Sequence, residues 1–176
     1  MHLVTLAAGI REPEGVNTSR RRFLRLAPGN AARPTIRPPW ALVPSEFLSI
    51  CTRCDQCARA CPTGIIARGD GGYPEVSFRD GECTFCGACA TACTPRALST
   101  GHAAWQLQPA LASSCLARHN VLCRACADVC DRAAIVFTLR PPRPSVQVDA
   151  SACNGCGACV RACPVSAISM QPAAIT

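Results

Sequence analysis

Sixteen cysteines, gathered in four runs, constrain this 176-residue chain more than any other feature. Three runs share the spacing C-x2-C-x2-C-x3-C; they are Cys51, Cys54, Cys57, Cys61; Cys83, Cys86, Cys89, Cys93; and Cys153, Cys156, Cys159, Cys163. The remaining run, C-x7-C-x2-C-x3-C, comprises Cys115, Cys123, Cys126 and Cys130. Leu, Ile, Val and Phe make up only about a fifth of the chain, near the lower limit for a packed core. Small domains with thin cores usually rely on metals or disulfides, so we expect the cysteines to stabilise the fold.

Disulfides and structural zinc are the simpler explanations for so many cysteines, and the spacing favours neither. Cysteines two or three residues apart suit local metal ligation better than cross-links between distant segments. Zinc sites usually use two C-x2-C pairs that lie far apart in the sequence, not tandem runs of four. The regular run is instead the ligand pattern of bacterial-type [4Fe–4S] ferredoxins, in which three cysteines bind one cubane and the fourth binds its neighbour.

Crossed ligation of this kind predicts which cysteines share a cubane, provided that the first two runs pair and the last two pair. The predicted ligand sets are Cys51, Cys54, Cys57 with Cys93; Cys83, Cys86, Cys89 with Cys61; Cys115, Cys123, Cys126 with Cys163; and Cys153, Cys156, Cys159 with Cys130. The alternative is that each run binds a cluster of its own. The three regular runs predict three [4Fe–4S] clusters, and the irregular run predicts a fourth.

The first ligand of the irregular run is open to two interpretations. Asn120 lies where the regular spacing would place a cysteine, and Cys115 lies five residues earlier. Cys115 preserves the spacing between successive runs, so an insertion between the first and second ligands explains the pattern. We interpret Cys115 as the ligand because a cubane needs a fourth thiolate. His119 is the alternative ligand.

Short apolar segments between the runs predict small β-hairpins, with strands at 65–67 and 76–78 and at 134–137 and 146–148. The segment 105–107 alternates between apolar and polar residues and predicts an edge strand. The predicted fold is α+β, with tandem bacterial-type two-cluster ferredoxin lobes of short hairpins and small helices around [4Fe–4S] clusters, and an extended N-terminal arm. The predicted divisions are a basic arm rich in Pro and Arg (1–44), lobe 1 (45–100) and lobe 2 (101–176).

The predicted arm contains a segment, 19–25, that looks like a twin-arginine export motif. The apolar run that a working export signal needs does not follow it. We therefore interpret the segment as part of a mobile basic arm; the alternative is an arm that docks on an acidic partner. Residues 28–44 are rich in Pro and Arg and predict an extended linker, with Trp40 packing on the first lobe.

Charge and motifs narrow the classes of function. The formal net charge is +7, but sixteen thiolates and four oxidised cubanes would add about −8, so the basic balance does not indicate nucleic acid. No apolar segment is long enough to predict a membrane span. The sequence contains no dinucleotide or P-loop motif and no nucleophile–His–acid set. These features indicate an electron carrier rather than an enzyme, with a redox partner protein.

The pattern as a whole resembles the NapF family, the ferredoxin-type proteins of the periplasmic nitrate reductase system. The residues that carry the resemblance, besides the irregular run and Trp105, are Ser19-Arg20-Arg21, Arg37-Pro38-Pro39-Trp40, Cys51-Thr52-Arg53-Cys54, Gly71-Gly72-Tyr73-Pro74 and the run from Cys153 to Cys159. The resemblance implies a cytoplasmic maturation factor whose partner is the precursor of the molybdenum-containing catalytic subunit. It implies action before export, by a redox or iron–sulfur step. The alternative is an electron-transfer subunit of a respiratory oxidoreductase complex.

Overall fold

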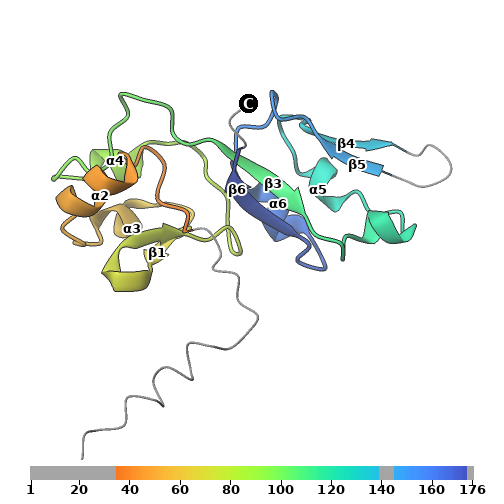
Figure 1. Ribbon diagram of the computed structural model, residues 1–176, viewed down its shortest axis with the longest axis horizontal. Helices are drawn as coiled ribbons and strands as arrows, with labels where there is room; N and C mark the ends of the chain where they lie inside the picture. Colours follow the sequence, from red (N-terminus) through yellow and green to blue (C-terminus); the bar gives the residue numbers. More distant parts are fainter. Residues whose placement is uncertain (1–34, 139–144, 174–176) are drawn as a thin grey trace, which may run out of the picture. The chain divides into compact units, whose positions relative to one another are not determined.

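The computed structural model describes residues 35–138 and 145–173 (Figure 1). We call residues 35–100 the N-terminal half and residues 101–173 the C-terminal half. The N-terminal half contains α2 (Pro44–Ile50), α3 (Gln56–Ala60), β1 (Ile66–Arg68), η1 (Asp70–Gly72), β2 (Pro74–Val76) and α4 (Ala88–Thr91). The C-terminal half contains β3 (Leu107–Leu111), η2 (Leu116–His119), α5 (Ala125–Asp128), β4 (Ile135–Thr138), β5 (Ser145–Val148), α6 (Ala158–Ala162) and β6 (Ile168–Pro172). The predicted export-like segment 19–25 lies outside the described residues, as do residues 139–144 between the two strands of the second predicted hairpin.

The strands of the described residues pair into antiparallel, two-stranded sheets (Figure 1). Both predicted hairpins form, with Ile66 opposite Val76 in β1–β2 and Ile135 opposite Val148 in β4–β5. The strand expected at 105–107 starts only at Leu107 and extends to Leu111, where it pairs along its whole length with β6. A shorter version of this pairing occurs in the N-terminal half as a bridge between Ala41 and Leu98. In each half, a segment before the first run therefore pairs with a segment after the second.

Three short helices begin in the middle of the regular cysteine runs, after a residue with left-handed backbone. These N-cap residues are Asp55 (φ 60°), Gly87 (φ 76°) and Gly157 (φ 83°). The left-handed residue lets the chain turn sharply between the second and third cysteines, and the helix then carries the third. The helices end after only a turn or so, and Cys61 and Cys163 are the C-caps of α3 and α6. The spacing of each run thus produces a loop followed by a single helical turn.

Residues 35–43 are packed rather than forming part of a free linker. Pro38 and Pro39 are among the largest fully buried side chains of the described residues. The Trp40 N–H donates to the carbonyl of Ala104, and the Ser99 N–H donates back to the carbonyl of Trp40. The Trp40 ring packs against the buried core, as we predicted for this residue. We expected residues 28–44 to form an extended linker. The part of this segment that the structure describes is packed instead, with Pro38 and Pro39 buried rather than solvated.

Candidate iron–sulfur centres

The structure brings together cysteines from neighbouring runs, and we name four sets by their predicted grouping. Set A is Cys51, Cys54, Cys57 and Cys93; set B is Cys61, Cys83, Cys86 and Cys89; set C is Cys130, Cys153, Cys156 and Cys159; set D is Cys115, Cys123, Cys126 and Cys163. The four cysteines of set A line one cavity together with Phe47, Pro74 and Leu98. The fourth cysteine of the second run therefore joins the first three of the first run.

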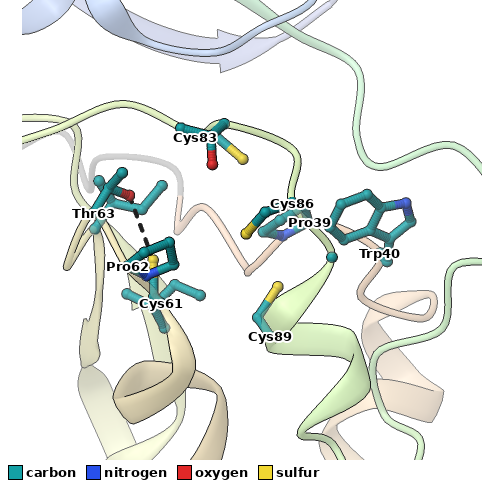
Figure 2. Close-up of a pocket in the computed structure, with 12 residues that line it drawn as sticks. Pro39, Trp40, Cys61, Pro62, Thr63, Cys83, Cys86 and Cys89 are labelled. Atoms are coloured by element: carbon teal, nitrogen blue, oxygen red, sulfur yellow. Dashed lines mark hydrogen bonds between the residues drawn. The ribbon is translucent and has the colours of Figure 1, made fainter.

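Set B lines a second cavity, shown in Figure 2. Cys61 reaches this cavity from the end of α3, and Cys89 reaches it from α4. Pro39 and Trp40 line the same cavity, so the segment before the first run covers part of set B. The Sγ atom of Cys61 lies 3.5 Å from Oγ1 of Thr63 (Figure 2). That hydroxyl can donate to a thiolate.

Set C repeats this arrangement in the C-terminal half. Its four cysteines line a cavity with Arg132, Ile135 and Met170. Cys130 comes from the irregular run, and the other three come from the last run. The irregular run thus contributes its final cysteine to a site that is otherwise built by a regular run.

Set D is brought together in part. Cys126 lies close enough to Cys115 and Cys123 for their charges to act on its pKa. Cys163 caps α6, the helix that packs against α5, which carries Cys126. The alternative ligand His119 has its Nε2 atom 2.9 Å from the carbonyl oxygen of Ser113, to which the ring N–H can donate.

Burial is the main influence on the thiols inside the cavities. It raises the pKa of Cys57 and of Cys89 to about 11 each, and that of Cys159 to about 12, with neighbouring thiolates adding to the effect. Cys54 and Cys86 are exposed instead. The backbone N–H of Gln56 is the main cause that lowers the pKa of Cys54. Set A therefore combines partly buried thiols with one at the surface, and set B combines buried and partly buried thiols with one at the surface.

Backbone N–H groups also point at individual sulfur atoms. The Phe85 N–H donates to Sγ of Cys83 at 3.4 Å, and the Ala167 N–H donates to Sγ of Cys163 at 3.2 Å. Such bonds orient metal-bound thiolates and stabilise their negative charge. The Trp105 Nε1 atom is buried and has no hydrogen-bond partner among the residues that the structure describes. It lies beside the last run, 3.1 Å from where a Cβ on Gly155 would stand.

The donor sets fit a multi-iron cubane. Within residues 35–138 and 145–173, no three His, Cys, Asp or Glu side chains gather closely enough to hold one metal ion. The thiols of sets A, B and C instead surround an open space, and a cubane takes each thiolate at a different iron. A [4Fe–4S] cubane is therefore the cofactor for which the positions of these cysteines are best suited.

Comparisons with known proteins identify the family. The model of the 4Fe–4S dicluster domain matches residues 50–97 and 121–172. The chain is 46% identical over 140 residues to the ferredoxin-type protein NapF of Escherichia coli (strain K12), covering 77% of this chain and 84% of that protein. The NapF protein of Haemophilus influenzae is 48% identical over 140 residues, covering 77% and 78% of the two chains. The chain belongs to the NapF family of ferredoxin-type proteins.

Membership of the NapF family confirms the family that the sequence suggested and the iron–sulfur character of the cysteine runs. The ferredoxin-type protein NapG of Haemophilus influenzae is a more distant relative, 32% identical over 165 residues. That match covers 78% of this chain and 58% of NapG. The second dicluster match begins at residue 121, so it includes Cys123 but leaves out Cys115. In the part of the chain that the structure describes, no helix has the length and apolar character needed to cross a bilayer.

Sequence reasoning missed two features around these centres. The helix α2 packs Phe47 over set A, and its start has a recognisable signal in Pro44 at the first helical position. The aromatic cluster of Phe78, Phe85 and Trp105 has no local signal, because Trp105 lies far along the chain from both phenylalanines.

Proposed function

We propose that the chain binds four [4Fe–4S] clusters, one in each of sets A to D, and carries single electrons. The observation that carries this proposal is the grouping of four cysteines from two neighbouring runs around each of three cavities. When bound, a cubane supplies a one-electron couple whose potential depends on burial and on hydrogen bonds to sulfur. The chain supplies the thiolates, excludes water from the buried ones and directs N–H groups at Cys83 and Cys163.

We further propose that each half is a two-cluster ferredoxin lobe. Sets A and B belong to the N-terminal half, and sets C and D belong to the C-terminal half. The helices pack accordingly, α3 against α4 and α5 against α6. In each half a segment before its first run pairs with a segment after its second run. Two equivalent lobes explain why the cysteine runs repeat in pairs.

The biological role that we infer is maturation of the catalytic subunit of periplasmic nitrate reductase. The chain would bind the molybdenum-containing precursor in the cytoplasm, before export, and act on it by electron transfer or by iron–sulfur handling. The support is family membership, since the NapF relatives match over most of both chains. The basic segment before residue 35 is the proposed docking arm.

The test is capture of the precursor by the holoprotein under anaerobic conditions. The unaltered chain should retain the cytoplasmic precursor and should not retain the exported, mature subunit. A chain that lacks residues 1–34 but keeps its iron tests the proposed docking arm, and it should capture less of the precursor than the unaltered chain does. Equal capture of an unrelated exported precursor would contradict the assignment of the partner.

An electron-transfer subunit of a respiratory oxidoreductase complex is the second candidate. The observation that favours it is the exposure of Cys54 and Cys86, through which an external redox protein could approach sets A and B. A deletion strain separates the two candidates. An inactive nitrate reductase that is restored by repair of its clusters or cofactor supports maturation. A fully assembled enzyme that lacks only electrons supports the second candidate.

A further inference from the structure

Two cysteines from different halves are joined directly by a backbone hydrogen bond. The peptide N–H of Cys83 donates to the carbonyl oxygen of Cys156 at 2.8 Å. Cys83 belongs to set B and Cys156 to set C, and each lines the cavity of its own set. No second hydrogen bond between cysteines of the two halves is found among the described residues. Sets B and C are therefore the pair whose ligands meet.

Three aromatic rings pack beside this hydrogen bond. The Trp105 ring, just before β3, stands edge-on to Phe78 with centroids 5.7 Å apart and to Phe85 with centroids 6.1 Å apart. Phe85 lies between Cys83 and Cys86 in the set B loop, and Phe78 follows β2 and is buried. The ring of a residue from the C-terminal half thus packs on two rings of the N-terminal half.

Two glycines of the last run allow this close approach. A Cβ on Gly157 would stand 2.1 Å from Cδ1 of Phe78, and a Cβ on Gly155 would stand 3.1 Å from Nε1 of Trp105. Real Cβ atoms do not approach a ring carbon as closely as 2.1 Å. The loop around set C therefore fits against the rings only because it lacks side chains there. The contact between the last run and the aromatic rings therefore depends on Gly155 and Gly157.

We propose that this junction is the route by which an electron crosses between the two halves. The path runs from Sγ of Cys83 through Cβ, Cα and the peptide nitrogen, across the hydrogen bond, and through the carbonyl, Cα and Cβ of Cys156 to its Sγ. With clusters held by the thiolates of sets B and C, one electron would pass from the reduced site to the oxidised site along this path, and no proton would need to move. Trp105 is a positioning residue, because its packing holds the two loops in hydrogen-bond contact. This inference rests on the proposed loading of sets B and C with clusters.

The consequence is that the four clusters act as one chain of carriers rather than as two independent pairs. The test starts with iron and sulfide content per chain, which decides the proposed cluster loading separately from the route. A photoreduced flavin then delivers about one electron per molecule, and spectra follow its redistribution among the clusters. In the unaltered holoprotein, redistribution should occur at a rate that does not depend on protein concentration.

The variant Trp105→Ala should split this behaviour into a fast phase within each half and a slower phase that accelerates with protein concentration. Trp105→Phe keeps a ring at the junction and should restore a rate independent of concentration. Phe137→Ala, which removes an aromatic ring from the β4–β5 hairpin, is the matched control and should leave redistribution unchanged. Unchanged kinetics in a fully loaded Trp105→Ala protein would overturn the route.

If Trp105→Ala does not retain its clusters, the unaltered protein still decides the question. A phase of redistribution in the unaltered, fully loaded chain whose rate is proportional to protein concentration would mean that electrons cross between molecules and not through the junction. Rates independent of protein concentration in every phase, in both the unaltered protein and Trp105→Phe, would support the route.

Discussion

At the scale of single residues, the sulfur atoms of one set have very different surroundings. Cys54 is exposed, whereas Cys57 in the same set is partly buried beside Cys51 and Cys93, and its pKa rises to about 11. Hydrogen bonds favour the thiolate form at Cys61, where donors from Thr63 and nearby backbone lower the pKa in spite of burial. These individual contacts determine how readily each site accepts iron and an electron.

Replacing Thr63 by Val should lower the reduction potential of the cluster in set B. The hydroxyl lies 3.5 Å from Sγ of Cys61, and a hydrogen bond to a ligating sulfur stabilises the more negative, reduced cluster. The expected shift is on the order of tens of mV, the equivalent of part of one hydrogen bond. A redox titration followed by EPR measures it. Thr91→Val is the control, because that hydroxyl donates to the Gly87 carbonyl and not to sulfur.

Retention of the clusters by the folded chain should improve with rising pH. The pKa of Cys57 and of Cys89 is raised to about 11 and that of Cys159 to about 12, so these thiols hold their protons at neutral pH. A ligating thiolate must release its proton, so acid competes with iron and base assists it. Anaerobic dialysis of the holoprotein should therefore leave more iron bound at pH 9 than at pH 7. Equal iron contents after dialysis at the two pH values would contradict this.

At the scale of elements, the regular runs repeat one loop-and-turn structure, and the sequence predicted most of it. The spacing of the cysteines indicated which of them share a cavity in sets A, B and C, and the alternating apolar segments placed both hairpins to within about two residues. The sequence did not predict the pairing of β3 with β6, because two strands so far apart along the chain produce no local sequence pattern that reveals their pairing. Trp105 was expected inside an edge strand, yet it precedes β3 and packs on rings of the other half.

Gly87 and Gly157 form a natural pair for testing the junction. Both are left-handed N-cap residues at the same position of their runs, but a Cβ at Gly87 would meet nothing within 4 Å, whereas one at Gly157 would clash with Phe78. Gly87→Ala should cost only the strain of a left-handed alanine, about 1 kcal/mol. Gly157→Ala should cost about 1–3 kcal/mol more, from overpacking against a buried ring. Thermal unfolding of the two holoproteins measures the difference, and equal stabilities would mean that the ring yields freely.

The irregular run offers a second test at this scale. The chain between Cys115 and Cys123 forms the short η2 turn and a left-handed Asn120, which brings Cys115 near Cys126. Cys115→Ser should therefore remove the cluster of set D alone, about a quarter of the iron if each set holds one cubane. His119→Asn should keep the full iron content. The reverse result would assign the ligand to His119.

At the scale of the whole molecule, the iron–sulfur groups must replace the core that the side chains do not provide. Phe47, Pro38 and Pro39 are the largest fully buried side chains of the described residues, and much of the remaining core is alanine and cysteine. Small alanine side chains bury little apolar area, so their contribution to stability is small. The cysteines, by contrast, line the cavities around which both halves are packed.

Removing the iron should therefore unfold the chain rather than leave a native-like apoprotein. The thiols, most of them partly buried, would then have no cluster to hold them together, and the energy of metal binding would no longer offset the loss of chain entropy. Anaerobic chelation should abolish the cooperative thermal transition and reduce the secondary-structure signal in circular dichroism. Reconstitution with iron and sulfide should restore both. Because sets B and C meet through the Cys83–Cys156 hydrogen bond, loss of iron from one half should also lower the stability of the other. A cluster-free chain that still melts cooperatively would place the source of stability in the side chains instead.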